Sequence, residues 1–485
     1  MTKLRKLLSV LFIATFLLSA CGQQTTPAAT QPPATEAPTM AATEAPTTAA
    51  TEAPTGAATE APTSAPGAAL RDPKEVALEA AGGEKIGGTV NILGVWAGSE
   101  EESWNAVVAP FEEATGIDVQ LEATRDLNAV LTTRVEGGNP PDLAAAPSAG
   151  QAATWAAEGK LKDLTNVVDM AQMKQDYAQS WLDLGTTPDG QLYQIFAWSA
   201  LKGPIWYDPK TYDGPNPPKT WDELAAWAKQ KADSGTTPWC IGLESGAASG
   251  WPGTDWIEDI VLRQSGPDVY DQWYQGKLPW TSPEIKSAFE VFGSVAADPK
   301  MVNGGPTTAL TLNFGNGGDA LFTDPPGCYL HHQATFITDF FTKNTPTVKP
   351  VEDFNFFGFP DINPEFSGAI EVVGDSFSMY NDTPQAQALI KYLTSPEAQS
   401  IWVARGGKLG ANKRVPLDAY PDELARNAGK IIASAQVVRF DASDLMPSAM
   451  NDAFWKAILD YVQNPGDLDS ILANLDSVQK DAYQQ

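Results

Sequence analysis

The segment TVNILGVWAGSEEESWNAVVAPFEEATGIDVQLEA, residues 89–123, indicates the fold class. The apolar run at 89–95 predicts a buried strand, and a second strand is expected at 118–122. Between them, apolar side chains repeat at helical spacing over 101–114, so they predict an amphipathic helix that ends at Gly116. Strands that alternate with helices through short connections are typical of a parallel sheet in an α/β domain.

The alternation continues along the chain, with a helix predicted at 127–135, a strand at 143–146 and a helix at 151–158. Ligands of such sheets bind at the loops that follow the carboxyl ends of the strands. One of these loops is 147–150, and the others contain the candidate ligand-binding residues Trp96, Ser99, Glu100, Arg125 and Asp126. The alternative for the charged pair in the second loop is a solvated ion pair that contributes little.

The first residues are typical of an export signal. Basic residues precede an apolar run at 7–18, which is too short to span a bilayer permanently. The residues that follow, Leu18-Ser19-Ala20-Cys21, resemble a bacterial lipobox. This resemblance implies a lipoprotein signal peptide at 1–20, cleavage before Cys21 and lipidation of that cysteine. The protein would then be extracytoplasmic and anchored to the cell membrane. The alternative is an ordinary signal peptide with an unrelated cysteine.

Residues 21–70 predict a disordered tether behind the lipidated cysteine. The unit ATEAPT recurs with its glutamates eight residues apart, and large apolar side chains are almost absent. Such a segment cannot bury enough surface to offset its conformational entropy. A coil of about 50 residues has a root-mean-square reach of roughly 40 Å, enough to hold a globular part away from a membrane.

Composition excludes several classes of function. The net charge is −28, whereas a nucleic-acid-binding protein needs a basic surface. The two histidines, His331 and His332, are adjacent, and no cysteine pair has zinc-ligand spacing. The sequence contains no nucleophile elbow, no Walker loop and no dinucleotide-binding glycine motif. We therefore expect no catalytic residue, no metal and no cofactor.

Two cysteines, Cys240 and Cys328, remain after the predicted anchor. An even number of cysteines in an exported chain favours a disulfide. Closing a loop of this length would stabilise the fold by about 4 kcal/mol in the chain-entropy model. The alternative is a pair of buried free thiols.

The segment RFDASDLMPSAMNDAFW, residues 439–455, has two interpretations. Its closely spaced carboxylates, next to an aromatic pair, could be the acid and base of a secreted glycoside hydrolase. They could equally bind the hydroxyl groups of a sugar beneath a stacking ring and perform no chemistry.

Several stretches resemble one known family. They are TRDLNAVLTTRVEGGNPPDLAAAP (124–147), WCIGLESGAASGWPGTDWIE (239–258), PGCYLHHQATF (326–336), VGDSFSM (373–379) and RFDASDLMP (439–447). The part from residue 87 to the end is similar to the extracytoplasmic solute-binding lipoproteins of ABC sugar importers, and most similar to the alpha-glucoside-type, maltose-binding-protein-like members. The resemblance implies a monomeric carbohydrate-binding protein, not an enzyme, that delivers an alpha-glucoside or another oligosaccharide to the transmembrane permease subunits.

The resemblance also implies an α/β, two-lobed periplasmic-binding-protein fold of type II-like topology, with a hinge between the lobes that closes on the ligand. About 400 residues follow the tether, more than one ordinary core accommodates. We expect lobe one at 87–198 plus 360–405 and lobe two at 205–357 plus 410–485.

Aromatic rings match the apolar faces of a sugar, whereas carboxylates, amides and arginine match its hydroxyl groups. Tryptophans at apolar positions inside predicted helices, such as Trp104, Trp221 and Trp227, are expected in the core. Tryptophans at strand ends, crossovers or glycine-rich loops are candidates for the site, and Tyr329 and Trp455 match positions where the family places stacking aromatics. The candidate aromatic residues beyond Trp96 are Trp198, Trp251, Trp256, Tyr329 and Trp455.

The polar candidates beyond the first loops are Asp255, Asp375, Ser376 and Asp444. Asp375 follows an apolar strand and should face the cleft, so it is the carboxylate that we most expect at the site. Arg439 and Asp441 are expected to brace their loop. A cell-surface adhesin is the third functional class, but adhesins are usually β-sandwiches rather than α/β proteins.

Overall fold

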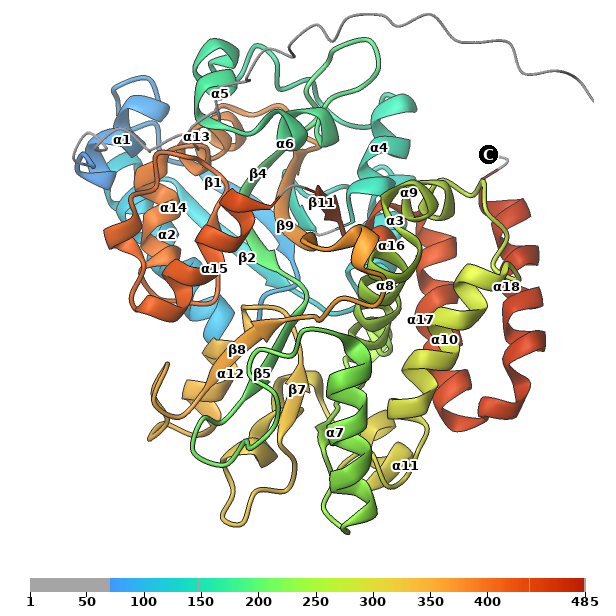
Figure 1. The fold of residues 1–485 in the computed structure, drawn as a ribbon. Coiled ribbons are helices and arrows are strands. Elements are labelled where there is room, and N and C mark those ends of the chain that lie inside the picture. Colours follow the sequence, from blue (N-terminus) through green and yellow to red (C-terminus); the bar gives the residue numbers. More distant parts are fainter. Residues whose placement is uncertain (1–69, 147, 436, 484–485) are drawn as a thin grey trace, which may run out of the picture. The chain divides into compact units, whose positions relative to one another are not determined.

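The computed structural model describes residues 70–146, 148–435 and 437–483, which belong to one compact unit (Figure 1). The predicted signal peptide, Cys21 and the tether before residue 70 lie outside the described residues. Within the described ranges, no helix combines the length and the apolar character that crossing a bilayer requires.

The larger of two sheets has seven strands. They are β1 (Thr89–Gly94), β2 (Asp118–Ala123), β3 (Leu143–Ala146), β4 (Gln194–Leu201), β9 (Ala369–Met379), β10 (Leu409–Gly410) and β11 (Val437–Phe440). The order is β10-β4-β9-β3-β1-β2, and β11 pairs with one end of β9. β1 is parallel to both β2 and β3, which confirms the predicted parallel arrangement, whereas the long β9 runs antiparallel to β3 and β4.

Helices cover this sheet. They are α1 (Pro73–Ala80), α2 (Ser99–Thr115), α3 (Leu127–Glu136), α4 (Ala149–Ala157), α5 (Met170–Asp176), α6 (Gln179–Leu184), α13 (Pro384–Leu393), α14 (Pro396–Val403) and α15 (Glu423–Ser434). Three of them, α2, α3 and α4, lie where helices are predicted from the sequence. The apolar face of α2 is buried in the core, as its spacing predicts, and α2 packs against α1 and α14. Gly116 ends α2 in a left-handed conformation at φ 68°, which a residue without a side chain adopts easily.

The smaller sheet has four strands, in the order β6-β7-β5-β8. They are β5 (Pro204–Tyr207), β6 (Trp239–Cys240), β7 (Leu330–His332) and β8 (Asn355–Gly358). β5 lies between β7 and β8 and is antiparallel to both. A disulfide joins Cys240 in β6 to Cys328, two residues before β7, which confirms the predicted pair.

Most helices of the second half of the chain pack around this smaller sheet. The helices are α7 (Trp221–Asp233), α8 (Trp251–Ser265), α9 (Pro267–Tyr274), α10 (Pro283–Ala296), α11 (Gly305–Thr311), α12 (Ile337–Asn344), α16 (Ala442–Leu445), α17 (Ser448–Gln463) and α18 (Leu468–Ala482). Short 3-10 turns are η1 (Gly246–Ala248), η2 (Phe314–Asn316), η3 (Asp319–Phe322), η4 (Pro364–Phe366), η5 (Leu417–Ala419) and η6 (Pro465–Asp467). α8 packs side by side with α10 and α17, and α17 with α18 (Figure 1).

The N-terminus of α7 has the N-cap of a capping box but not its second hydrogen bond. Thr220 Oγ1 accepts a hydrogen bond from the backbone N–H of Glu223 at 3.3 Å, as a helix N-cap should. The Glu223 carboxylate, however, accepts from the backbone N–H of Lys219 at 2.8 Å rather than from the cap residue itself.

One extended segment links the two sheets. β4 continues into β5 through Lys202 and Gly203, so these two residues form the crossing between the two sheets (Figure 1). A side chain at position 203 would meet the Asp259 carboxylate, its Cβ only 2.7 Å from Oδ2, so glycine permits this close approach. The chain returns from β8 to β9 through residues 359–368.

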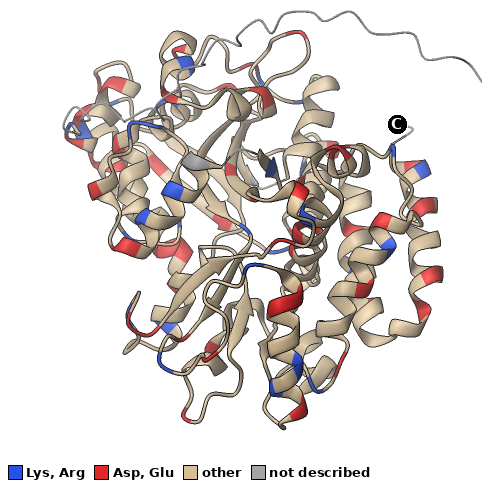
Figure 2. Ribbon diagram, viewed as in Figure 1, with Lys and Arg blue, Asp and Glu red and all other residues tan. Residues whose placement is uncertain are grey.

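Each sheet lies in its own large hydrophobic core. The prediction of a two-lobed α/β architecture is therefore confirmed. The segment expected wholly in lobe two, 410–485, departs from this division in its first part: Ala411, Val415, Tyr420 and Ala428 belong to the core of the seven-stranded sheet, and β11 pairs with β9. Acidic residues lie on the helices around both sheets (Figure 2).

Candidate ligand-binding site

A cavity of about 380 Å³ lies between residues of the large sheet and its loops on one side and residues of α8 and α17 on the other. It has the size and the mixture of apolar and polar walls that small-molecule sites have. Its aromatic lining residues are Trp96, Trp251, Phe336 and Trp455. The ionisable lining residues are Glu100, Arg125, Asp126, Lys202, Asp255, Asp375, Lys408, Asp441, Asp444 and Asp452.

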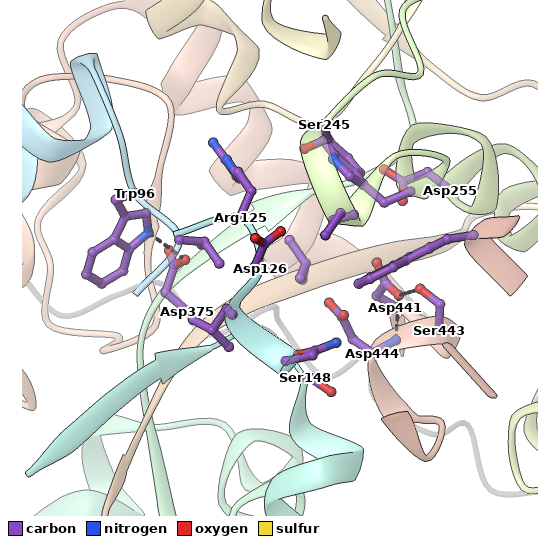
Figure 3. A pocket seen from close by; sticks show the side chains of 18 of the residues that line it. Trp96, Arg125, Asp126, Ser148, Ser245, Asp255, Asp375, Asp441, Ser443 and Asp444 are labelled. Atoms are coloured by element: carbon purple, nitrogen blue, oxygen red, sulfur yellow. Dashed lines mark hydrogen bonds between the residues drawn. The ribbon is translucent and has the colours of Figure 1, made fainter. Parts of the chain in front are cut away.

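Loops at the carboxyl ends of the large-sheet strands supply one side of the cavity. Asp375, on β9, accepts a hydrogen bond from Trp96 Nε1 at 3.3 Å, and its other oxygen lies 2.9 Å from Lys408 Nζ (Figure 3). Glu100 lies 3.3 Å from Arg125 Nη2 and 3.8 Å from Lys408 Nζ. We call these four charged residues (Glu100, Arg125, Asp375 and Lys408) the Asp375 cluster. Two carboxylates face two cations in it.

The opposite side is built around Lys202, which lies at the junction of β4 and β5. Its Nζ is 2.7 Å from Asp255 Oδ1 and 2.8 Å from Asp441 Oδ2, and all three side chains are almost fully buried. We call these three residues the Lys202 cluster. The same ammonium lies 5.0 Å from the Trp251 ring centroid, within cation–π range.

Helical geometry places the α8 residues of the site. Trp251 and Asp255 are four residues apart, so they lie on one face of α8, and this face meets the cavity. Gly250, at φ 109°, precedes the helix, and a side chain there would collide with the Trp455 carbonyl. This glycine therefore lets the start of α8 approach α17 closely.

The segment 439–455 combines a structural and a lining role. The two nitrogens of Arg439 lie 2.7 and 2.9 Å from the two oxygens of Asp271, an ion pair that braces the strand as expected. Asp441 caps α16 by accepting from the backbone N–H of Asp444 at 3.0 Å and from Ser443 Oγ at 2.8 Å (Figure 3). Asp444 and Trp455 line the cavity, as predicted from the sequence.

Several buried polar atoms at the cavity have no hydrogen-bond partner among the residues that the structure describes. They are Ser148 Oγ, Ser245 Oγ, Asp255 Oδ2, Asp375 Oδ2 and Trp455 Nε1, of which Asp375 Oδ2 still lies 2.9 Å from the Lys408 ammonium. Buried polar groups in proteins are nearly always paired, with protein, water or ligand. The cavity thus offers both donors and acceptors to a ligand that carries hydroxyl groups.

Burial and charge divide the carboxylates of the site. Burial raises the pKa of Asp255 to about 7, although the Lys202 ammonium opposes this change. Asp441 shares the same ammonium, yet its pKa is lowered: burial would raise it, but Lys202, Ser443 and the Asp444 amide together favour its charged form. Burial, followed by repulsion from Asp441, raises the pKa of Asp444 well above its usual range. Asp441 therefore carries the charge, and Asp255 and Asp444 are the carboxyl groups that can hold a proton.

Nine residues predicted from the sequence line the cavity together. They are Trp96, Glu100, Arg125, Asp126, Trp251, Asp255, Asp375, Asp444 and Trp455. Trp96 is only 1% exposed and packs against Trp104 and Trp402, so it orients Asp375 through its N–H rather than offering a ring face.

The structure places the other five candidates away from the cavity lining. Ser376 follows Asp375 in β9, so strand alternation turns it to the opposite face, where it accepts a hydrogen bond from Gln194 at 2.6 Å. Ser99 begins α2 and leaves the lining position to Glu100.

The remaining three aromatic candidates are packing residues. Trp198, in β4, is fully buried and donates to the Gln399 carbonyl at 3.1 Å. Trp256 lies five residues after Trp251, hence on another face of α8, in the smaller-sheet core. Tyr329 packs against the α7 residues Trp227 and Lys231. A tryptophan or tyrosine in a loop or at a crossover is therefore insufficient evidence of ligand contact.

Sequence reasoning missed several lining residues, chiefly Lys202, Lys408, Ser245 and Phe336. Both lysines lie in the short segments between the expected lobe ranges, 199–204 and 406–409, where the chain should cross from one lobe to the other. This position is the signal that could have identified them. Ser245 and Phe336 had no such signal in the sequence, because their positions at the cavity depend on how distant loops pack together.

The fold and the site together define a class of protein: a two-lobed binding protein whose ligand cavity lies between the lobes. A family model described as bacterial extracellular solute-binding protein matches residues 97–400. The chain belongs to this family. It is therefore an extracytoplasmic solute-binding protein, and the predicted absence of enzymatic activity agrees with the family.

Two curated relatives support this assignment along most of the chain. The chain is 40% identical to the osmoprotective compounds-binding protein GgtB of Synechocystis sp. over 376 residues, which are 77% of this chain and 88% of the relative. It is 37% identical to the alpha-glucosides-binding periplasmic protein AglE of Rhizobium meliloti over 388 residues, 78% of this chain and 84% of the relative.

Solved structures agree on the fold. A chitin oligosaccharide binding protein superposes with a TM-score of 0.71 at 18% identity, over 82% of this chain and 99% of that chain. The solute-binding protein RafE in complex with raffinose has a TM-score of 0.65 at 18% identity, over 81% and 99% of the two chains. At this identity the likeness supports the shared two-lobed fold alone.

Proposed function

We propose that this protein binds a neutral carbohydrate, an alpha-glucoside or another oligosaccharide, in the cavity between its lobes. The observation that carries the proposal is the pairing of the Trp251 and Trp455 rings with buried polar atoms that lack protein partners, at Ser148, Ser245 and Asp255. Aromatic rings suit the apolar faces of a sugar, and unpaired hydroxyl, indole and carboxyl groups suit its hydroxyl groups. The name of the relative AglE, an alpha-glucosides-binding periplasmic protein, supports the same class of ligand.

The protein then delivers this ligand to the permease subunits of an ABC importer. Two homologous chains of Pyrococcus horikoshii are named ABC transporter extracellular-binding proteins, which supports this role. We further propose that Cys21 is lipidated and anchors a monomer to the membrane through the tether. Lobe one would be based on the seven-stranded sheet and lobe two on the four-stranded sheet, with Lys202 and Gly203 at one hinge crossing.

Isothermal titration calorimetry of the protein with a panel of disaccharides and oligosaccharides tests the binding proposal. We expect saturable 1:1 binding of at least one alpha-glucoside, with a change of tryptophan fluorescence when the lobes close. Steady release of monosaccharide during the titration would instead support the hydrolase alternative. If no member of the panel bound, the carbohydrate proposal would be wrong, whereas the family assignment would stand.

The anchor is tested separately. Mass spectrometry of the membrane-extracted protein should show a diacylated N-terminal cysteine, and a Cys21→Ser variant should appear in the soluble fraction. A membrane-bound Cys21→Ser variant would contradict the lipid anchor.

A further inference from the structure

Glu371 is a buried carboxylate for which the described chain provides no partner. It lies in β9, is 0% exposed, and neither of its carboxylate oxygens accepts a hydrogen bond from any described residue. A carboxylate that is removed from water without a partner is strongly destabilising. A counter-charge, a proton or a bound molecule must therefore face Glu371.

The Lys202 cluster lies directly next to this carboxylate. Glu371 and Lys202 are neighbours across the β4–β9 pair, where the backbone N–H of Lys202 donates to the Glu371 carbonyl at 3.0 Å. One carboxylate oxygen from each of Asp255, Glu371 and Asp441 lies within 4.8 Å of the other two. Oδ2 of Asp255 also has no partner among the described residues. Two of the three carboxylates thus present unpaired oxygens inside the fold.

The cations of this region are already engaged elsewhere. Arg263 pairs with Asp259, and His332 Nε2 lies 2.8 Å from the same carboxylate. Lys202 is the one cation that contacts Asp255 and Asp441 among the described residues. Three carboxylates and one ammonium leave a net charge of −2 when all four groups are ionised.

The neighbouring carboxylate Glu258 adds no counter-charge, and its oxygens are used. They accept from the backbone N–H groups of Ala442 and Ser443 at 2.6 and 3.3 Å, at the start of α16. Glu258 therefore does not neutralise the negative charge around Glu371.

We propose that Asp255, Glu371 and Asp441 bind one hard divalent cation, of the Ca²⁺ or Mg²⁺ type, beside Lys202. The donor set consists of oxygen atoms, which these ions prefer over nitrogen or sulfur ligands, and a single divalent ion neutralises the charge of −2. Asp255 and Asp441 also line the sugar cavity, so water can complete the coordination from that side. The expectation of no metal rested on histidine and cysteine spacing, which does not detect carboxylates that come from separate elements.

The cation would connect residues from three separate elements of the fold. Asp255 belongs to α8, Glu371 to β9, and Asp441 precedes α16, while Lys202 lies at the crossing between the two sheets. Glu371 is not a lining residue of the cavity, whereas Asp255 and Asp441 are, so the cation would lie at the wall of the cavity.

Metal titration of the full chain tests the proposal. After treatment with a chelator and exchange into metal-free buffer, the protein is titrated with CaCl₂, MgCl₂ and TbCl₃. We expect one ion per chain by calorimetry, a higher melting temperature with the bound ion, and Tb³⁺ luminescence excited through the nearby Trp251. If protons alone neutralise the three carboxylates, no saturable binding would occur up to millimolar metal and the proposal would be overturned.

Three variants locate the ion. E371Q should lower the metal affinity at least tenfold, whereas E371D, which keeps the carboxylate, should bind with intermediate affinity. D339N removes another carboxylate, that of a partly exposed residue outside the three-residue group, so it should bind metal like the unaltered protein. Unchanged affinity in E371Q would place the ion elsewhere and overturn the proposal. If E371Q did not fold, E371D and the unaltered chain would decide the question.

Discussion

The two charged clusters that face each other across the cavity are built differently. In the Asp375 cluster, two carboxylates meet two cations, and Trp96 adds a neutral donor. In the Lys202 cluster, one ammonium serves two carboxylates, and the unpaired Glu371 lies beside them. The difference teaches that similar residue types at one cavity can form either a self-sufficient network or one that requires a further positive charge.

Replacing Lys202 by methionine is the strongest test of this contrast. Lys202→Met removes the ammonium that pairs with the buried Asp255 and Asp441, which should cost about 3–5 kcal/mol of unfolding free energy in metal-free buffer. Lys408→Met, in the Asp375 cluster, should cost much less. Glu100 would still pair with Arg125, and Asp375 would still accept the hydrogen bond from Trp96. Urea unfolding of the three proteins measures both effects, and an equal or larger loss for Lys408→Met would contradict the contrast.

Asp339 tests whether the Asp375 cluster is balanced at every pH. This residue of α12 lies next to Glu100, and burial raises its pKa to about 8. The folded protein then holds a proton that the unfolded chain releases at its ordinary carboxyl pKa, so stability should fall as pH rises from about 4 to about 8. Above and below that window the Asp339 contribution should be constant.

The Asp339→Asn variant cannot lose this proton, so it should not show the decline. Relative to the unaltered protein, it should gain on the order of 2 kcal/mol in unfolding free energy between pH 5 and pH 8. Denaturant unfolding at several pH values measures the difference. Parallel pH profiles for the two proteins would show that Asp339 is ionised in the folded state.

The smallest expected effect concerns the rings that complete the cavity between the clusters. Trp455→Ala removes a stacking surface and an unpaired N–H, so the sugar affinity should fall about tenfold, a change of about 1.4 kcal/mol. Trp227→Ala is the matched control, because this tryptophan packs against Tyr212 and Tyr329 away from the cavity. Equal affinities of Trp455→Ala and the unaltered protein would remove Trp455 from the site.

Much of the fold follows from local sequence patterns. The apolar face of α2, the glycine that ends it, and the proline and serine or threonine caps of α13 and α14 determine the bounds of those elements. Strand–helix alternation at residues 89–157 likewise predicts the parallel β1, β2 and β3. These features depend on neighbours in the chain, so they can be recognised without knowledge of distant contacts.

The site was predictable only in part, for a physical reason. Trp251 and Asp255 were predicted from a glycine-rich loop, Trp455 from the resemblance to the family, and Asp375 from its place after an apolar strand, although it lies inside β9. Trp198 and Trp256 satisfied the same criteria, yet the phase of β4 and α8 turns them into the two cores. A shift of one residue along a helix or strand changes the face on which a side chain lies, and composition does not record that phase.

The sequence by itself determined the α/β class, the cysteine pair and the family, and the export signal that it predicts at the N-terminus stays a prediction. Tertiary structure alone decided which carboxylates share Lys202, that Glu371 has no partner in the described chain, and that β11 returns to the large sheet. The former depend on short segments and on counts of residues. The latter depend on contacts between residues far apart in the sequence, 53 positions for Lys202 and Asp255 and more for the others, which only the packing of the folded chain sets.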